Sequence, residues 1–109
     1  MYSFGVDASY ISKGIALCYT AGMAPKICLV LTEDTIDKNI QLIERYRSWI
    51  DIVELRADFL DPQELLYIRA FPKIAHIPAI LTIRRFLDGG TFKGGEGSRI
   101  TLFARGLAF

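Results

Sequence analysis

Charged residues recur at every second position of a short segment that is otherwise apolar. Residues 51–58 read DIVELRAD, so in an extended strand Glu54, Arg56 and Asp58 point to one face and the apolar residues between them to the other. In a sheet covered on both faces, these charges must pair with one another or line a cavity, because burying them unpaired is costly. Carboxylates accept hydrogen bonds from hydroxyls and guanidiniums offer forked donors to anions. The pattern therefore predicts a site for an anionic, hydroxylated small molecule.

A second arginine extends this pattern. Residues 77–84 read IPAILTIR, which predicts another strand, and Arg84 is its last residue. If the two strands are parallel, Arg84 emerges beside the strand end that carries Glu54 and Arg56, where substrates bind in β/α barrels and open α/β sheets. Two alternatives stay open. An antiparallel sheet would leave the charges in water, and Glu54 with Arg84 could form a structural ion pair that binds no ligand.

Strands and helices alternate along the chain from Lys26. The predicted strands are residues 26–32, 51–58 and 77–84. The predicted helices are residues 36–48, a second one that starts at Asp61-Pro62-Gln63-Glu64 and stops at Pro72, and a last one capped by Ser98. Strand–helix repeats with short links are typical of parallel βαβ units, which predicts an α/β fold.

The loop after the third strand, residues 86–97, holds five glycines and two acidic residues, of which Asp88 lies just past the strand and close to the predicted site. Asp88 could join the site or could be a turn residue before Gly89-Gly90. The loop matches neither the P-loop nor the dinucleotide-binding glycine pattern. His76 precedes the third strand, which places it at the opposite end of the sheet.

Composition excludes several classes of partner. The 109 residues carry a net charge of +1 with scattered basic residues, which gives no reason to expect nucleic acid or a membrane surface as a partner. No apolar run approaches the ~20 residues of a membrane span. Cys18 and Cys28 give little reason to expect a disulfide framework, and there is no second cysteine pair for a zinc site, so we expect a cytoplasmic protein. Residues 1–25 form a predicted N-terminal extension, and Met23 is a candidate for the natural start.

Taken together, KICLVLT, DIVELRAD and AILTIRR followed by Asp-Gly-Gly resemble the N-terminal part of type I 3-dehydroquinate dehydratase. The resemblance covers residues 26–109 and implies the βαβαβα portion of an incomplete (β/α)8 TIM barrel. It implies a lyase of the shikimate pathway that forms a Schiff base with 3-dehydroquinate and needs no metal or organic cofactor. Glu54, Arg56 and Arg84 would bind substrate, and Asp88 would stand where the family places an assisting acid. A full-length form would be a homodimer or be fused to another shikimate-pathway enzyme.

Two departures from the family pattern qualify this expectation. The family usually has glutamate at the position of Asp88, so the reach of the shorter side chain differs. The resemblance also places the Schiff-base lysine and the catalytic histidine on later strands, and neither His76 nor any lysine of this sequence occupies a matching position. We therefore expect this chain to be truncated and inactive by itself. The alternatives are a non-catalytic relic or binding fragment, and another β/α enzyme that acts on a sugar acid.

Overall fold

The strands of the computed structural model form a single sheet whose order follows the sequence. The structure describes residues 15–18, as backbone only, and residues 26–107, and the predicted start at Met23 lies outside these residues. The strands, in sheet order, are β1 (Ile15–Cys18), β2 (Lys26–Leu31), β3 (Ile52–Arg56) and β4 (Ala79–Thr82). The pairs β2–β3 and β3–β4 are parallel, which confirms the predicted α/β fold with three parallel strands.

β1 was not predicted from the sequence. It pairs antiparallel with β2, from Ile15 opposite Leu29 to Cys18 opposite Lys26, and so covers one edge of the parallel sheet. A strand of four residues in a segment without a clear hydrophobic period gives too little alternation to detect.

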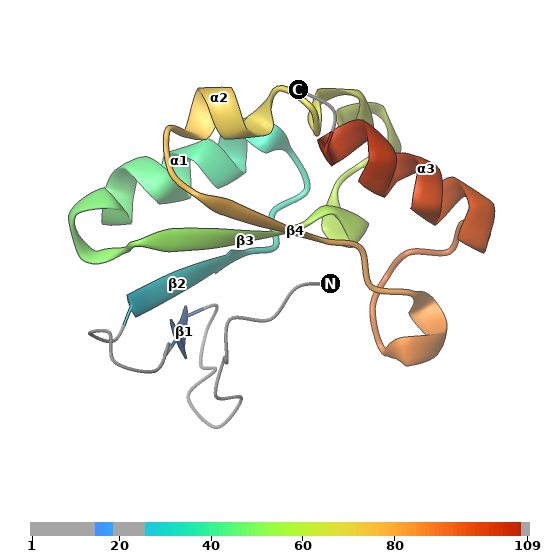
Figure 1. Ribbon diagram of the computed structural model, residues 1–109, viewed down its shortest axis with the longest axis horizontal. Coiled ribbons are helices and arrows are strands. Elements are labelled where there is room, and N and C mark those ends of the chain that lie inside the picture. The colour runs from blue at the N-terminus through green and yellow to red at the C-terminus, as the bar shows by residue number, and fades with distance from the viewer. Residues whose placement is uncertain (1–14, 19–25, 108–109) are drawn as a thin grey trace.

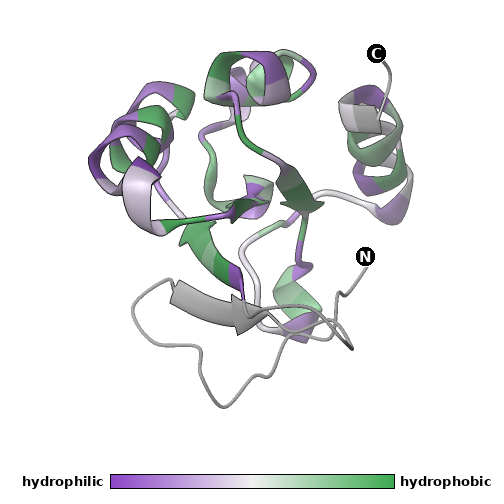
Figure 2. Ribbon diagram, turned by 60° about the vertical axis from the view of Figure 1, so that its left-hand side comes forward, coloured by the Kyte–Doolittle hydropathy of each residue, from purple (hydrophilic) through white to green (hydrophobic). Residues whose placement is uncertain are grey.

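The helices lie along one side of the parallel strands. They are α1 (Ile36–Tyr46), α2 (Phe71–Ala75) and α3 (Glu96–Leu107), joined by the 3-10 turns η2 (Arg47–Trp49), η3 (Ala57–Phe59), η4 (Pro62–Tyr67) and η5 (Phe86–Asp88). Figure 1 shows α1, α2 and α3 on the same side of β2, β3 and β4. In Figure 2 the three helices form an arc around green, hydrophobic strands, as the outer helices of a barrel do. This arrangement agrees with the predicted partial TIM barrel.

The hydrophobic core fills the space between the sheet and this arc. Val53 and Leu55 of β3 are buried on the helix-facing side, and Phe71 of α2 is only 1% exposed. The rest of the core comes from every layer of the fold, including Leu31, Ile43, Ala75, Ile83 and Leu102. The apolar half of the alternation in residues 51–58 thus packs against helices, which leaves Glu54 and Arg56 on the other face.

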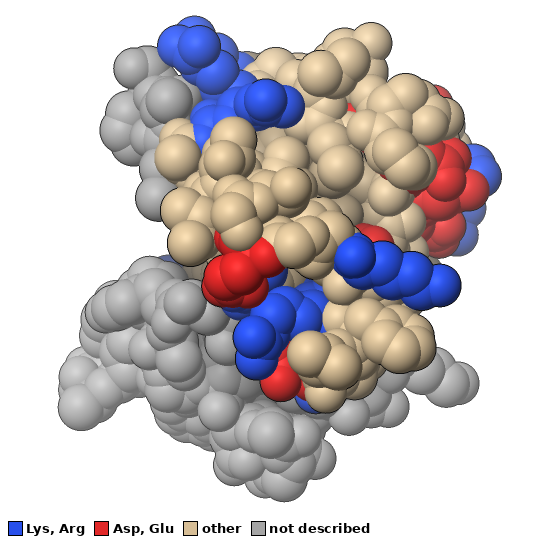
Figure 3. All heavy atoms as spheres, turned by 90° about the vertical axis from the view of Figure 1, so that its right-hand side faces the viewer, with Lys and Arg blue, Asp and Glu red and all other residues tan. Residues whose placement is uncertain are grey.

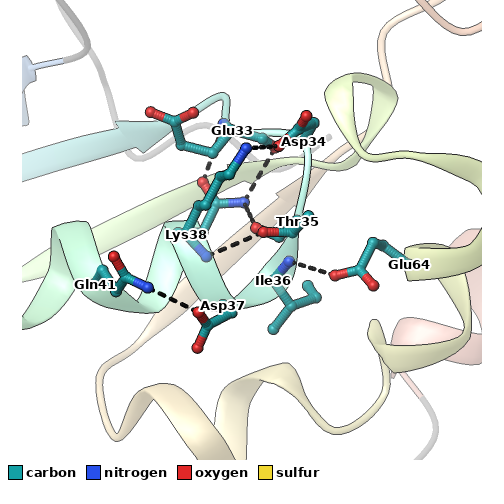
Figure 4. Close-up of polar contacts among 9 residues, drawn as sticks. Glu33, Asp34, Thr35, Ile36, Asp37, Lys38, Gln41 and Glu64 are labelled. Carbon is teal, nitrogen blue, oxygen red and sulfur yellow. Dashed lines mark hydrogen bonds and ion pairs between the residues drawn. The ribbon is translucent and has the colours of Figure 1, made fainter.

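The helix predicted to start at Asp61 differs from the structure. Residues 62–67 form a 3-10 turn, and the Asp61 side chain caps nothing. Glu64 instead accepts a hydrogen bond from the Ile36 backbone N–H at 2.7 Å, and so caps the start of the neighbouring helix α1 (Figure 4). Thr35 accepts from the Lys38 N–H at 3.1 Å at the same helix end. A capping side chain can bond to the free N–H groups of any helix that starts nearby. The order of the residues in the sequence does not tell which helix that is.

Two further helix boundaries were predicted wrongly. Pro72 does not stop a helix but lies in the first turn of α2. Proline is tolerated there because a backbone N–H in the first turn has no acceptor within the helix. α3 begins at Glu96 instead of after Ser98, since the Arg99 N–H already donates to the Gly95 carbonyl at 3.1 Å.

His76 ends α2 in a left-handed conformation that is unfavourable for a residue with a Cβ atom. Its φ is 53°, and Arg47 donates to its carbonyl at 3.2 Å. We expect His76→Gly to raise the free energy of unfolding by about 0.5 kcal/mol, because glycine is unstrained there while making the unfolded chain more flexible. Urea midpoints of His76→Gly and the control His76→Ala check this. An alanine variant as stable as the glycine variant would contradict it.

Candidate active site

The parallel register brings the predicted site residues to one end of the sheet. Glu54 lies opposite Ile80, and Arg56, the last residue of β3, lies opposite Thr82, the last residue of β4. Arg84 follows two residues later. The loops after β2 and β3 meet at the same end, where the Asp61 N–H donates to the Asp34 carbonyl at 2.8 Å. This is the carboxyl end, where α/β enzymes bind their substrates.

Arg56 is held firmly at this end. Its Nε donates to Asp58 Oδ1 at 2.9 Å and its Nη2 to Asp58 Oδ2 at 2.7 Å, a forked ion pair. The guanidinium also lies 4.9 Å from the centroid of the Phe59 ring. The Arg56 side chain nevertheless keeps 16% of its surface exposed, so part of this cation can reach a ligand.

Asp58 is the buried partner of this pair. Its side chain is fully buried, and it also accepts from the Thr91 N–H at 3.1 Å. Burial alone would raise the pKa of Asp58, but hydrogen bonds from Arg56 and from the backbone of Thr91 and Arg84 outweigh it and lower the pKa. Asp58 is therefore an ionised carboxylate that joins β3 to the loop after β4.

The other two predicted substrate-binding residues keep their polar groups available. Glu54 is half-buried, and among the described residues its carboxylate forms no ion pair. Its negative charge adds a smaller effect to that of Asp58 in raising the pKa of Arg56. The alternative of a structural ion pair between Glu54 and Arg84 is thus not realised within the described part of the chain. Arg84 is exposed, and its guanidinium lies against Gly89.

The loop after β4 is a compact turn. The Phe92 N–H donates to the Arg84 carbonyl at 3.2 Å, and the Gly90 N–H donates to the Arg85 carbonyl at 2.9 Å. Gly89 has φ 92°, a conformation that favours glycine. Thr91 then reaches Asp58 through its backbone N–H and its hydroxyl. Sequence reasoning missed Thr91, because a threonine after two glycines carries no signal of a partner 33 positions away.

Asp88 is not brought into hydrogen-bond contact with the other predicted site residues. It lies exposed in η5 and forms an ion pair with Arg85 at 2.7 Å. The hydrogen bond from Arg85 lowers the pKa of Asp88, and Arg84 adds a smaller effect of the same sign. Figure 3 shows basic and acidic atoms side by side on the face that carries α3 and this loop.

Other kinds of site find less support in the described residues. An open pocket of about 400 Å³ lies beside η5 and is lined by residues such as Phe86, Phe92 and Lys93, but by neither Glu54 nor Arg56. Within residues 15–18 and 26–107, no group of three histidine, cysteine, aspartate or glutamate side chains could hold a metal ion. In the same part of the chain, no helix is both long and apolar enough to cross a membrane.

Comparison with known proteins assigns the chain to a family. The family model of type I 3-dehydroquinase matches residues 27–109, which include β3, β4 and all of β2 except Lys26. The chain belongs to the type I 3-dehydroquinase family. This confirms the resemblance carried by residues 51–58 and by Arg84.

Relatives named 3-dehydroquinate dehydratase match most of the chain at modest identity. The protein of Methanocaldococcus jannaschii is 36% identical over 81 residues, which cover 74% of this chain and 36% of the relative. The protein of Methanococcus vannielii is 35% identical over 74 residues, covering 68% of this chain and 33% of the relative. That of Coxiella burnetii is 34% identical over 70 residues, covering 64% and 30%. The chain thus spans about a third of the length of these relatives.

Proposed function

We propose that the chain forms the substrate-binding part of a 3-dehydroquinate dehydratase, the lyase that converts 3-dehydroquinate to 3-dehydroshikimate and water. The observation that carries this proposal is the forked Arg56–Asp58 ion pair at the end of β3, beside the strand from which Arg84 emerges. Family membership supports the same reaction, as do the names of the relatives.

Each strand-end residue has a role that its chemistry supports. Arg56 and Arg84 offer two cations to the substrate carboxylate, for which guanidinium donors are well matched. Glu54, whose carboxylate forms no ion pair among the described residues, would accept hydrogen bonds from substrate hydroxyls. Asp88 stays our candidate for the assisting acid, and its low pKa means that it would act as an ionised group.

The Schiff base and the main proton transfers would need groups beyond these residues. His76 caps α2 before β4 begins, at the end of the sheet away from Arg56. Lys93 lies over the Phe86 ring at 5.5 Å, in the exposed loop. His76 is thus not positioned to move protons next to Arg56, and Lys93 is not positioned to form an imine there, so the chain by itself should bind substrate without dehydrating it.

A graft tests the proposed function. Residues 27–107 replace the matching segment of the Methanocaldococcus jannaschii dehydratase, and the enone product is followed by its absorbance. Arg56→Ala or Arg84→Ala should raise KM by about 10- to 100-fold, since a hydrogen bond to a charged group contributes about 1.5–3 kcal/mol. Arg69→Ala, which removes an exposed arginine before α2, is the matched control.

The result that overturns the proposal is a folded graft that turns over no 3-dehydroquinate, which would favour the non-catalytic alternative. Equal effects of Arg69→Ala and Arg84→Ala would also overturn it. If the graft does not fold, substrate titration of the 109-residue chain with the same three variants decides instead.

Location and assembly are part of the proposal. We propose a cytoplasmic protein, because a sequence with two cysteines gives little reason to expect the disulfide framework of a secreted domain. Homodimerisation of the whole protein, or its fusion to another shikimate-pathway enzyme, stays a prediction.

A further inference from the structure

We propose that Asp58 is a positioning residue that fixes Arg56 and the loop after β4 in one arrangement, so that Arg56 and Arg84 meet the substrate together. The inference rests on the proposed substrate-binding role of these two arginines. It adds a residue that does not itself contact substrate but determines where both cations lie.

The first step concerns the hydrogen bonds that the buried Asp58 carboxylate accepts. The Asp58 side chain has no exposed surface, and both of its oxygens accept hydrogen bonds from the Arg56 fork. Oδ2 also accepts from the Thr91 backbone N–H at 3.1 Å, and the Asp58 carbonyl accepts from the Thr91 hydroxyl. A buried carboxylate is tolerated only when it is paired and hydrogen-bonded in this way.

The second step is the direction that the fork gives to Arg56. A guanidinium is planar and has five N–H donors, of which Asp58 engages one on Nε and one on Nη2. Phe59 covers one face of the plane. The remaining donors, including those on Nη1, have no hydrogen-bond partner among the described residues. Asp58 therefore holds one edge of Arg56 and leaves the other edge for an anion.

The third step links the same carboxylate to Arg84. Thr91 stands between Gly90 and Phe92, and both of these pack or bond directly onto Arg84. The Phe92 N–H donates to the Arg84 carbonyl at 3.2 Å, and a Cβ atom on Gly90 would lie 2.6 Å from the Arg84 carbonyl carbon. A shift of Thr91 would therefore be passed on to the Arg84 backbone through Gly90 and Phe92. Asp58 thus couples a residue of β3 to a loop more than 30 positions further along the chain.

A set of four variants of the 109-residue chain tests this coupling by NMR. Asp58→Asn removes the charge of the buried carboxylate, and Asp37→Asn, the control, removes the charge of an exposed aspartate in α1. Thr91→Val replaces the hydroxyl with a methyl group, whereas Thr91→Ser keeps the hydroxyl and removes the methyl group. The probes are hydrogen exchange of the Arg56 Nε–H and of the Gly90 and Phe92 amides. The third probe is the affinity for added 3-dehydroquinate.

Asp58→Asn should speed exchange at Arg56 and at both loop amides at least tenfold and weaken 3-dehydroquinate binding by a similar factor. Thr91→Val should speed exchange of the loop amides and weaken binding while the Arg56 fork persists, and Thr91→Ser should return both to the wild-type level. If Asp58 only stabilised the fold, Asp58→Asn would lower stability, but substrate binding would not differ between Thr91→Val and Thr91→Ser.

Two results would overturn the inference. One is an Arg56 or loop exchange rate in Asp58→Asn that equals that of Asp37→Asn. The other is a Thr91→Ser variant as weakened in binding as Thr91→Val. If Asp58→Asn does not fold, the two Thr91 variants decide. If wild-type chain binds no 3-dehydroquinate, the proposed function fails, and the exchange rates alone judge whether Asp58 positions Arg56 and the loop.

Discussion

Replacing Phe71 with alanine should lower the free energy of unfolding by about 3–5 kcal/mol, the largest effect we expect from a single substitution. The Phe71 side chain is 1% exposed and lies in the core cluster between α2 and the sheet. Its removal takes away apolar burial and leaves a cavity that the surrounding residues cannot fill completely. Since domains are stable by only about 5–15 kcal/mol, much of the fold should be lost.

Urea unfolding followed by circular dichroism measures this effect. Trp49→Ala is the matched control, because it also removes a large aromatic side chain, but one that is 72% exposed in η2. We expect the control to change stability by less than about 0.5–1 kcal/mol. If the two substitutions lower the free energy of unfolding equally, Phe71 does not have the core role that the structure indicates.

Gly90→Ala should have the second largest effect, a loss of about 1–3 kcal/mol. The added Cβ atom would lie 2.6 Å from both the Arg84 carbonyl carbon and the Arg84 Cβ, so backbone must move. The loop then separates from Arg84, and the hydrogen bond from the Phe92 N–H to the Arg84 carbonyl weakens. Stability and the position of Arg84 should therefore be lost together.

Gly95→Ala provides the control from the same loop. A Cβ atom at Gly95 would meet nothing within 4 Å, so this variant should match wild type within about 0.5 kcal/mol. Thermal unfolding together with the amide spectrum of residues 84–92 compares the two. A Gly90→Ala variant whose Arg84 amide and melting temperature are unchanged would show that the close approach can relax at no cost.

Much of the fold was predictable, because short apolar runs in the sequence mark its parallel strands. Residues 26–32, 51–58 and 77–84 each contain a strand of the structure, and these three strands are parallel as the alternating helices require. The region around Asp61 was not predictable in the same way. Its capping residues suit a helix start, yet Glu64 caps α1 across a loop, a pairing that only the tertiary structure creates.

The candidate site, too, was predictable from the sequence only in part. Alternation along β3 predicts that Glu54 and Arg56 share a face, and the register agrees. Asp58 was expected on that face as a third polar group, but the chain turns into η3 after Arg56 and folds the carboxylate back onto Arg56. The partner of Asp58 in the loop, Thr91, depends on how Gly90 packs against Arg84, which no local pattern encodes.

The central claim is that the carboxyl ends of β3 and β4 bind 3-dehydroquinate, and titration of the 109-residue chain with this substrate tests it most directly. We predict NMR shift changes centred on Glu54, Arg56 and Arg84, which Arg56→Ala and Arg84→Ala abolish and Arg69→Ala leaves in place. Shift changes centred on the pocket beside η5, or a response that survives loss of both site arginines, would contradict the claim.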